Sequence, residues 1–569
     1  MFSALSRSLK NERSLASIQS NLLAGLTVGI IALPLSMALA IASGVAPQQG
    51  LYTAIVGSIV IALTGGSKVN ISGPTAAFVV ILLPIVQQYG LGGLLVSGFM
   101  AGGILILMGL FRLGRFIEIV PYPVTIGFTA GIGVVIATIQ IKDFLGLNFE
   151  SPANAHYVDK LVLLYRALPT VNWQESAIGC LTLLVLVLWS RRKSKIPGHL
   201  VALLIGSIAA WLGSHNLDGF SVATINSRFH YEQAGLVHQG IPPFLPHFSL
   251  PWEQLNAQGK PIGISFELVR NLLSGAITIA VLGALESLLC AVIADGMSGK
   301  KHSPNDELIG QGLGNMIAPF FGGIPATAAI ARTAASIRAG GSSPLASVVH
   351  GLFIIVAILL LTPMLGYIPM ASMSALLLMV AWNMSETKHF IRTLKIAPRD
   401  DVIALLTCFL LTIIFDMTIA VAVGMSLSAV LFINRSISLT QVSAIDLEKE
   451  TQLNFPKETI IYEINGPLFF GSAQKALRSI TDISLEIKIV VLDMTKVSML
   501  DMSAIIAMES IIKNCTDNQL TLIISNLQPR MILKLRRAGL HGKHQNIYFA
   551  RSLTESLEIS KKIANNILE

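Results

Sequence analysis

The sequence contains few charged side chains. Asp, Glu, Lys and Arg make up 13% of its 569 residues, whereas soluble proteins contain about 25%. The deficit is confined to residues 21–434, which form apolar blocks separated by short segments of glycine, proline and basic residues. After Arg435 the charged residues return and the apolar runs become shorter. The composition excludes a single soluble core and predicts a membrane domain, residues 1–435, followed by a soluble domain, residues 436–569.

Cysteine is also scarce. Cys180, Cys290, Cys408 and Cys515 are not grouped in any close motif, which excludes a disulfide framework and a zinc site of the usual spacing. The sequence lacks a Walker loop, and Gly310-Gln-Gly-Leu-Gly314 does not follow a predicted strand. We therefore expect neither an enzyme nor a bound cofactor or metal, and we interpret this glycine run as a close helix-packing surface.

The basic residues predict a membrane orientation. Excess Lys and Arg in short loops marks the cytoplasmic side, and with fourteen crossings all the basic clusters fall on the side of the N-terminus. The long loop 213–266 then lies outside, and its only Lys or Arg residues are Arg228 and Lys260. The net charge of +8 therefore reflects topology rather than nucleic-acid binding. The polar first 20 residues and the long first apolar block predict no cleavable signal peptide.

One acid lies within an apolar stretch. Glu286 is surrounded by the apolar residues of segment 276–293, and an ionised carboxylate at membrane depth costs about 2.5–3.5 kcal/mol on insertion scales. A chain tolerates this cost when the group faces a partner, a cavity or a proton. We interpret Glu286 as a functional residue; the alternative is a structural acid paired with a cation on a neighbouring helix.

Two polar, glycine-rich segments interrupt the apolar pattern. The first, residues 65–78, contains Pro74, which we expect at the first position of a helix. The apolar run from Thr75 to about Gln87 is too short to span about 30 Å at 1.5 Å per residue. It predicts a half-helix that begins near the middle of the membrane.

The second segment, residues 322–333, repeats this pattern: a glycine pair, Pro325, then a short helix of Thr and Ala. Such interrupted segments in corresponding halves point to a transporter binding site. Two facing helix N-termini would present free N–H groups and positive dipole ends, which suit an anion. The alternative is a pair of ordinary proline-kinked helices. Seven helices in each half require an inverted repeat.

The C-terminal region has a different pattern. Period-two apolar runs predict strands at residues 459–466, 487–493 and 520–525, and helical patterns occur at 472–479, 503–513 and 529–538. Alternating strands and helices indicate an α/β domain.

Several motifs resemble those of one family. They are Gly29-Ile-Ile-Ala-Leu-Pro34, Gly44-Val-Ala-Pro-Gln-Gln-Gly-Leu-Tyr52, Ser72-Gly-Pro-Thr-Ala76, Leu285-Glu-Ser-Leu-Leu289, the stretch from Glu307 to Asn315, Val491-Leu-Asp493 and Leu500-Asp501. The chain resembles SulP-type anion transporters (the sulfate permease family) with a C-terminal STAS domain. This resemblance implies an α-helical membrane protein with fourteen transmembrane segments in a 7+7 inverted repeat. It also implies a uracil-permease-like core (helices 1–4 and 8–11) and gate (helices 5–7 and 12–14), and an α/β STAS domain.

The resemblance also implies a site. The residues that match the family's anion-binding positions are Gly73, Thr75 and Ala76 at the start of helix 3, and Thr327, Ala328 and Arg332 at helix 10. Glu286 matches the acid that binds the coupling ion, and Cys290 stands where sodium-coupled relatives have Thr after Asp. Because hard cations prefer oxygen ligands to sulfur, the Glu286–Cys290 pair favours a proton as the coupling ion.

The expected function is proton-coupled symport of a small anion. Stretches 140–146 and 381–385 are similar to a branch of the family that carries C4-dicarboxylates, so succinate, fumarate or aspartate is the expected substrate. The alternatives are a sulfate or bicarbonate transporter, coupled to sodium or protons, and an anion channel or exchanger. We expect an integral protein of the bacterial inner membrane with both termini in the cytoplasm. The expected partners are lipid, a second copy in a homodimer and a cytoplasmic protein bound by the STAS domain, but no nucleic acid.

Overall fold

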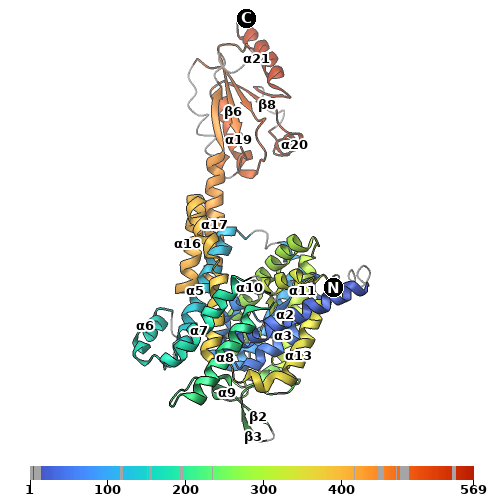
Figure 1. The fold of residues 1–569 in the computed structure, drawn as a ribbon. Coiled ribbons are helices and arrows are strands. Elements are labelled where there is room, and N and C mark those ends of the chain that lie inside the picture. Colours follow the sequence, from blue (N-terminus) through green and yellow to red (C-terminus); the bar gives the residue numbers. More distant parts are fainter. Residues whose placement is uncertain are drawn as a thin grey trace. The chain divides into compact units, whose positions relative to one another are not determined.

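The structure is a computed structural model. It describes residues 4, 14–115, 120–149, 152, 157–192, 194, 196–233, 235–415, 417–445, 454–469, 471–473, 486–540 and 546–568. The chain divides into two compact units, Met1–Ser426 and Leu427–Glu569 (Figure 1).

The first unit is a helical bundle. Its main helices are α2 (Leu15–Ala42), α3 (Pro47–Thr64), α4 (Ala76–Leu110), α5 (Tyr122–Phe144), α7 (Trp173–Ser190), α8 (Gly198–Asn216), α10 (Phe266–Ser298), α11 (Pro304–Ile317), α12 (Ile330–Arg338), α13 (Leu345–Leu365), α14 (Met370–Met384) and α16 (Arg399–Ile414). Helix α17 (Met417–Leu439) contains the boundary between the units. The other elements are α6 (Tyr157–Ala167), α9 (Ile225–Arg228), α15 (Thr387–Ile396), and a hairpin of β2 (His230–Gln233) and β3 (Leu236–Gln239).

Helix α4 consists of two helical segments. Gly90 interrupts it with a non-helical backbone, φ 71° and ψ −171°, a conformation that glycine adopts at little cost. The described residues from α2 to α17 contain the fourteen predicted segments. This count takes the two parts of α4 separately and leaves out the helices α6, α9 and α15. Within the part of the chain that the structure describes, eight helices are by themselves long and apolar enough to cross a membrane.

The start of the first half-helix differs from the prediction. Thr75 is the N-cap and α4 begins at Ala76, so Pro74 precedes the cap instead of opening the helix. The predicted half-helix is otherwise present, since its helical backbone ends at Gly90. The second one, α12, has only nine residues.

The helices of this unit contact one another in two groups. Helices α2, α3, α4, α10, α11, α12 and α13 form one group, and α5, α7, α8, α14 and α16 form most of the other. Within the first group α2, α3 and α13 lie side by side (Figure 1). The grouping agrees with the predicted core and gate.

Small residues allow the helices of the first group to approach closely. A Cβ atom on Gly312 would lie 2.6 Å from the carbonyl oxygen of Gly102, and a Cβ on Gly102 would lie 2.6 Å from the carbonyl oxygen of Gly312. The backbones of α4 and α11 therefore touch at this pair. The glycine run around Gly312 is a packing surface, as predicted.

The second unit contains a five-stranded sheet. Its strands, in spatial as well as chain order, are β5 (Gln441–Ile445), β6 (Thr459–Asn465), β7 (Ile489–Asp493), β8 (Thr521–Ser525) and β9 (Ile547–Ala550). Strand β5 is antiparallel to β6, and the other neighbours are parallel. The helices are α19 (Met502–Asp517), α20 (Pro529–Arg537) and α21 (Leu553–Leu568).

The α/β prediction for this unit is confirmed. The three predicted strands are β6, β7 and β8, and two predicted helices are α19 and α20. The predicted helix 472–479 lies mostly outside the described residues. Strands β5 and β9 and helix α21 were not predicted.

Candidate functional site

The two broken segments meet through a short β-pair. Strand β1 (Ser72–Gly73) is antiparallel to β4 (Thr327–Ala328), with Ser72 opposite Ala328 and Gly73 opposite Thr327. All four residues are buried. This pairing satisfies backbone groups that have no helical partner. We call the pair and the helix starts that follow it the crossing.

Each strand of the crossing leads into a helix whose N-cap side chain does not cap it. Thr75 is the N-cap of α4 and Ala329 that of α12, and neither side chain bonds to the first turn of its helix. Uncapped first-turn N–H groups are the usual means by which helices bind anions. The crossing therefore contains two uncapped helix starts, the feature from which the sequence analysis predicted an anion site.

Arg332 lies in the first turn of α12 and is only 1% exposed. Its Nη2 atom donates a hydrogen bond to the carbonyl oxygen of Pro74. Its Nε and Nη1 atoms have no hydrogen-bond partner among the described residues. A buried guanidinium with two unpaired donors is a strong site for an oxyanion, because planar N–H pairs match oxyanion geometry.

Glu286 lies on α10 beside the crossing. Its Oε2 atom accepts a hydrogen bond of 2.9 Å from Thr75 Oγ1. Glu286 and Arg332, both described, form no ion pair with each other. The two charges interact only over a longer distance, and the choice between a functional and a structural role for Glu286 stays a prediction. The carboxylate instead contacts the residue at which α4 begins.

Cys290 lies one turn after Glu286 but contacts a different element. Its Sγ atom donates to Thr333 Oγ1 at 3.3 Å, and the same hydroxyl oxygen accepts a 3.0 Å bond from the Ile71 amide. Similarly, Thr327 Oγ1 donates to the Gly283 carbonyl oxygen at 3.0 Å. Cys290 and Thr327 thus tie the crossing to α10 with bonds that do not include Glu286.

The structure brings all eight predicted site residues to the crossing or to the adjoining face of α10. Gly73 illustrates how closely they pack, since a Cβ atom there would lie 2.5 Å from Arg332 Nη1. Ala76 and Ala328 contribute backbone and no polar side chain. The roles assigned to these residues remain predictions.

A row of buried polar side chains on α11 forms hydrogen bonds to both broken segments. The sequence analysis assigned these side chains no role in the site. Glu307, Gln311 and Asn315 are spaced by four residues and are at most 1% exposed. Glu307 Oε2 accepts from the amides of Gly66 (3.0 Å) and Ser67 (2.8 Å).

The rest of the row continues toward the second segment. Glu307 Oε1 accepts from Asn70 Nδ2 at 2.9 Å, and Gln311 Nε2 donates to Ser72 Oγ at 3.1 Å. Asn315 donates to the Ala326 carbonyl and accepts from its amide, at 2.8 and 2.7 Å. The four-residue spacing was a visible signal, because such residues share one helix face.

Replacing Glu307 by alanine should strongly destabilise the first unit. Each buried donor left unpaired costs about 1–3 kcal/mol, and Gly66, Ser67 and Asn70 would all lose an acceptor. Glu307→Gln should destabilise the unit less than Glu307→Ala. The Oδ1 of Asn70 and the Oε1 of Gln311 have no partner, and rotation of these two side-chain amides can pair both oxygens with the new NH₂ group. The measurement is the monodisperse fraction after a heating series; equal heat resistance of Glu307→Ala and the parent would contradict this role.

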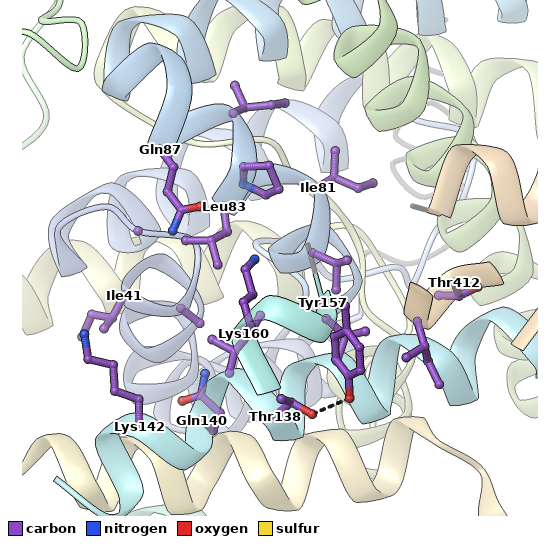
Figure 2. A pocket seen from close by; sticks show the side chains of 18 of the residues that line it. Ile41, Ile81, Leu83, Gln87, Thr138, Gln140, Lys142, Tyr157, Lys160 and Thr412 are labelled. Atoms are coloured by element: carbon purple, nitrogen blue, oxygen red, sulfur yellow. Dashed lines mark hydrogen bonds between the residues drawn. The ribbon is translucent and has the colours of Figure 1, made fainter. Parts of the chain in front are cut away.

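A cavity of about 730 Å³ lies next to the crossing. Residues of α2, α4 and α10 line one side and residues of α5, α6, α9 and α16 the other. Figure 2 shows Leu83 and Gln87 of α4 opposite Thr138 and Gln140 of α5. Its α4 residues begin at Val80, one turn after Ala76, and its α10 residues end at Thr278, two turns before Glu286. None of the eight predicted site residues lines it. Its volume is typical of small-molecule sites.

Comparison with known proteins identifies the class. The model of the sulfate permease family matches residues 18–435, and the STAS domain model matches residues 449–552. The chain belongs to the sulfate permease family and carries a C-terminal STAS domain, as the sequence predicted. It is therefore an integral, multi-pass membrane protein of a family of anion transporters.

Individual relatives match over most of their length. "Putative sulfate transporter YvdB" of Bacillus subtilis is 40% identical over 532 residues, which cover 93% of this chain and 95% of the relative. "Bicarbonate transporter BicA" of a Picosynechococcus species is 27% identical over 536 residues, covering 90% and 89%. Their names refer to sulfate and bicarbonate and not to C4-dicarboxylates, so they favour the alternative substrates over the expected one.

Solved structures confirm the fold. The transmembrane domain of a cyanobacterial BicA has a TM-score of 0.59 at 27% identity, covering 73% of this chain and 98% of that chain. The structure of SLC26A9 has a TM-score of 0.82 at 16% identity, covering 99% and 93%. The second likeness concerns the fold alone.

Proposed function

We propose that this protein is a secondary active transporter that carries a small oxyanion, sulfate or bicarbonate, together with protons across the bacterial inner membrane. The observation that carries the proposal is the buried Arg332 guanidinium, with two unpaired donors at the start of α12. The names of the relatives support the choice of anion.

Anion binding follows from the chemistry of the crossing. The uncapped starts of α4 and α12 contribute positive dipole ends, each equivalent to about half a charge. Arg332 adds a full charge and a planar fork of donors. Because the Thr75 hydroxyl is engaged by Glu286, backbone amides and Arg332 supply most of the donors to the anion.

Proton coupling follows from charge balance. Without an anion the Arg332 cation and an ionised Glu286 compensate each other in a site of low dielectric. A bound bicarbonate would leave one uncompensated negative charge and sulfate two, and such charges are costly when buried. A proton on Glu286 removes one of them, so anion and proton favour each other's binding.

Sodium is the less suitable coupling ion. A sodium ion needs several oxygen ligands, whereas the group one turn after Glu286 is the thiol of Cys290, which is bonded to Thr333. Sulfur is a poor ligand for hard cations. A proton needs only the carboxylate itself.

C4-dicarboxylates are the second candidate substrates. Stretches 140–146 and 381–385 resemble a dicarboxylate-carrying branch, and Gln140, Lys142 and Asp143 of the first stretch line the cavity, whose volume of about 730 Å³ accommodates a four-carbon diacid. Cytoplasmic termini, a homodimer and a cytoplasmic protein partner of the STAS domain complete the proposal; they rest on the basic loops and the family resemblance.

The test is uptake by the purified full chain in proteoliposomes. Radiolabelled sulfate, bicarbonate and succinate would each be offered with an inward proton gradient, an inward sodium gradient or neither. We expect uphill accumulation of sulfate or bicarbonate with the proton gradient alone. Accumulation that needs sodium would contradict proton coupling, and flux that never exceeds equilibrium would indicate a channel or exchanger.

A further inference from the structure

The cavity beside the crossing is lined by four charged side chains: Lys142, Asp143, Lys160 and Arg228. Three of them are basic and one is acidic, so the cavity favours anions electrostatically. Which of these charges remains available depends on the bonds that each one already makes.

Three of the four charges are already engaged. Arg228 Nη1 and Asp143 Oδ1 form an ion pair of 2.5 Å. Lys142 Nζ donates to the Phe149 carbonyl oxygen at 2.6 Å and lies 4.9 Å from the centre of the Phe149 ring. Each of these contacts offsets part of the charge that the group presents to the cavity.

Lys160 is the exception. It is half-buried and lines the cavity, and it has no hydrogen-bond or ion-pair partner among the residues that the structure describes. Figure 2 shows its side chain in the middle of the cavity, with the amine on the side of Leu83. Leaving an ammonium partly desolvated and unpaired is unfavourable, and a bound anion would remove that cost.

The short helix that carries Lys160 is fixed in place. The hydroxyl groups of Thr138 on α5 and Tyr157 at the start of α6 are hydrogen-bonded at 2.9 Å. Leu147, Leu164 and Ala167 form a small apolar cluster between α6 and the end of α5. The position of Lys160 in the cavity is therefore set by packing at both ends of α6, and the amine needs little rearrangement to bind.

We propose that Lys160 forms a second anion site in this cavity, separate from the crossing, which takes a small oxyanion or carboxylate before it reaches Arg332. That this anion is the transported one rests on the proposed function; the existence of the site does not. Because Lys160 lies on the α5, α6 and α16 side, an anion there faces α4 and α10, the helices that lead to the crossing.

The chemistry of the amine provides a direct readout. Burial lowers the pKa of Lys160 from its ordinary value of 10.5, so its neutral, nucleophilic form is more abundant than that of an exposed lysine. An anion within about 4–6 Å raises such a pKa by about one unit or more. Binding should therefore slow acylation of Lys160 about tenfold.

The experiment measures acylation of the full chain in phosphatidylcholine nanodiscs by a water-soluble amine reagent, with peptide mass spectrometry. Sulfate, bicarbonate and succinate are added separately, and chloride, which is neither an oxyanion nor a carboxylate, keeps the ionic strength constant. We expect protection of Lys160 by at least one anion and none of Lys260, which is exposed in the long loop. Equal acylation of Lys160 with and without every anion would overturn the proposal.

Two further arms separate the possible origins of protection. In the Arg332→Ala variant protection of Lys160 should persist; its loss would mean that the effect comes from the crossing, and no second site exists. Nanodiscs containing phosphatidylglycerol test a lipid phosphate: protection by that lipid, with none from free anions, would also overturn the proposal. Because no arm requires transport, failure of proton-driven uptake would leave this result unaffected.

Transport kinetics test whether the site serves uptake. Lys160→Gln should raise KM several-fold and leave kcat unchanged, whereas Lys160→Arg, which keeps the charge, should restore KM. Lys260→Gln is the matched control. An unchanged KM in Lys160→Gln would exclude a role in uptake even if the lysine binds anions.

Discussion

Replacing Arg332 by alanine should leave a folded protein that binds its anion at least about 100-fold more weakly. Two donors of Arg332 are free to bind an anion, and hydrogen bonds to charged groups contribute about 1.5–3 kcal/mol each. Folding should survive, because Arg332 forms no ion pair with Glu286 and its loss leaves only the Pro74 carbonyl without its partner. The measurement is sulfate binding by calorimetry on the purified variant.

The same helix offers a control. Arg338 is also on α12 but is exposed, so Arg338→Ala should bind as the parent does. The anion affinity of Arg332→Lys should lie between those of the parent and the alanine variant, since lysine keeps the charge but lacks the planar set of N–H donors. Unchanged affinity in a monodisperse Arg332→Ala protein would show that the guanidinium does not contact the anion.

Replacing Glu286 by glutamine should uncouple transport from the proton gradient. Glutamine is neutral and nearly the same shape as protonated glutamate, and its carbonyl can still accept the Thr75 hydrogen bond. The variant should bind the anion and exchange it across the membrane but should not concentrate it. In the parent, uptake should rise as external pH falls, because protonation is needed to carry the charge of the anion.

Accumulation under an imposed proton gradient decides the role of Glu286. Glu267→Gln is the matched control, since Glu267 is on the same helix but exposed, and it should accumulate as the parent does. Accumulation by Glu286→Gln equal to that of the parent would assign Glu286 a structural role. If uptake by the parent protein depends on the sodium gradient at constant pH, Glu286 can still be the coupling site, but the coupling ion is sodium and not a proton.

The sequence predicted the parts of the fold that have a local signal. Proline and glycine pairs located both half-helices, and a single acid in an apolar helix located Glu286. The three central strands of the second unit were found because period-two patterns in short apolar runs are typical of strands. Strands β5 and β9 lie at the sheet edges and are largely exposed, so their apolar patterns are weak.

The parts that the sequence did not predict depend on contacts between distant segments. Strands of two residues, such as β1 and β4, have no periodicity to detect. Glu307 was visible as an acid, but its partners Gly66 and Ser67 lie about 240 positions away. The cavity is lined by residues of seven helices, and which of its charged side chains already has a partner depends on neighbours that only the folded chain provides.

The pairing of Gly73 with Thr327 has a consequence for biosynthesis. Strand β1 leaves the ribosome about 250 residues before its partner, and at about 5–20 residues per second the wait is about 12–50 seconds. During that time a non-helical backbone segment of the nascent first half has no strand to bond with, although unpaired backbone is not tolerated in lipid. The newborn first half must therefore be sheltered by the insertion machinery, or keep this segment in water, until the second half arrives.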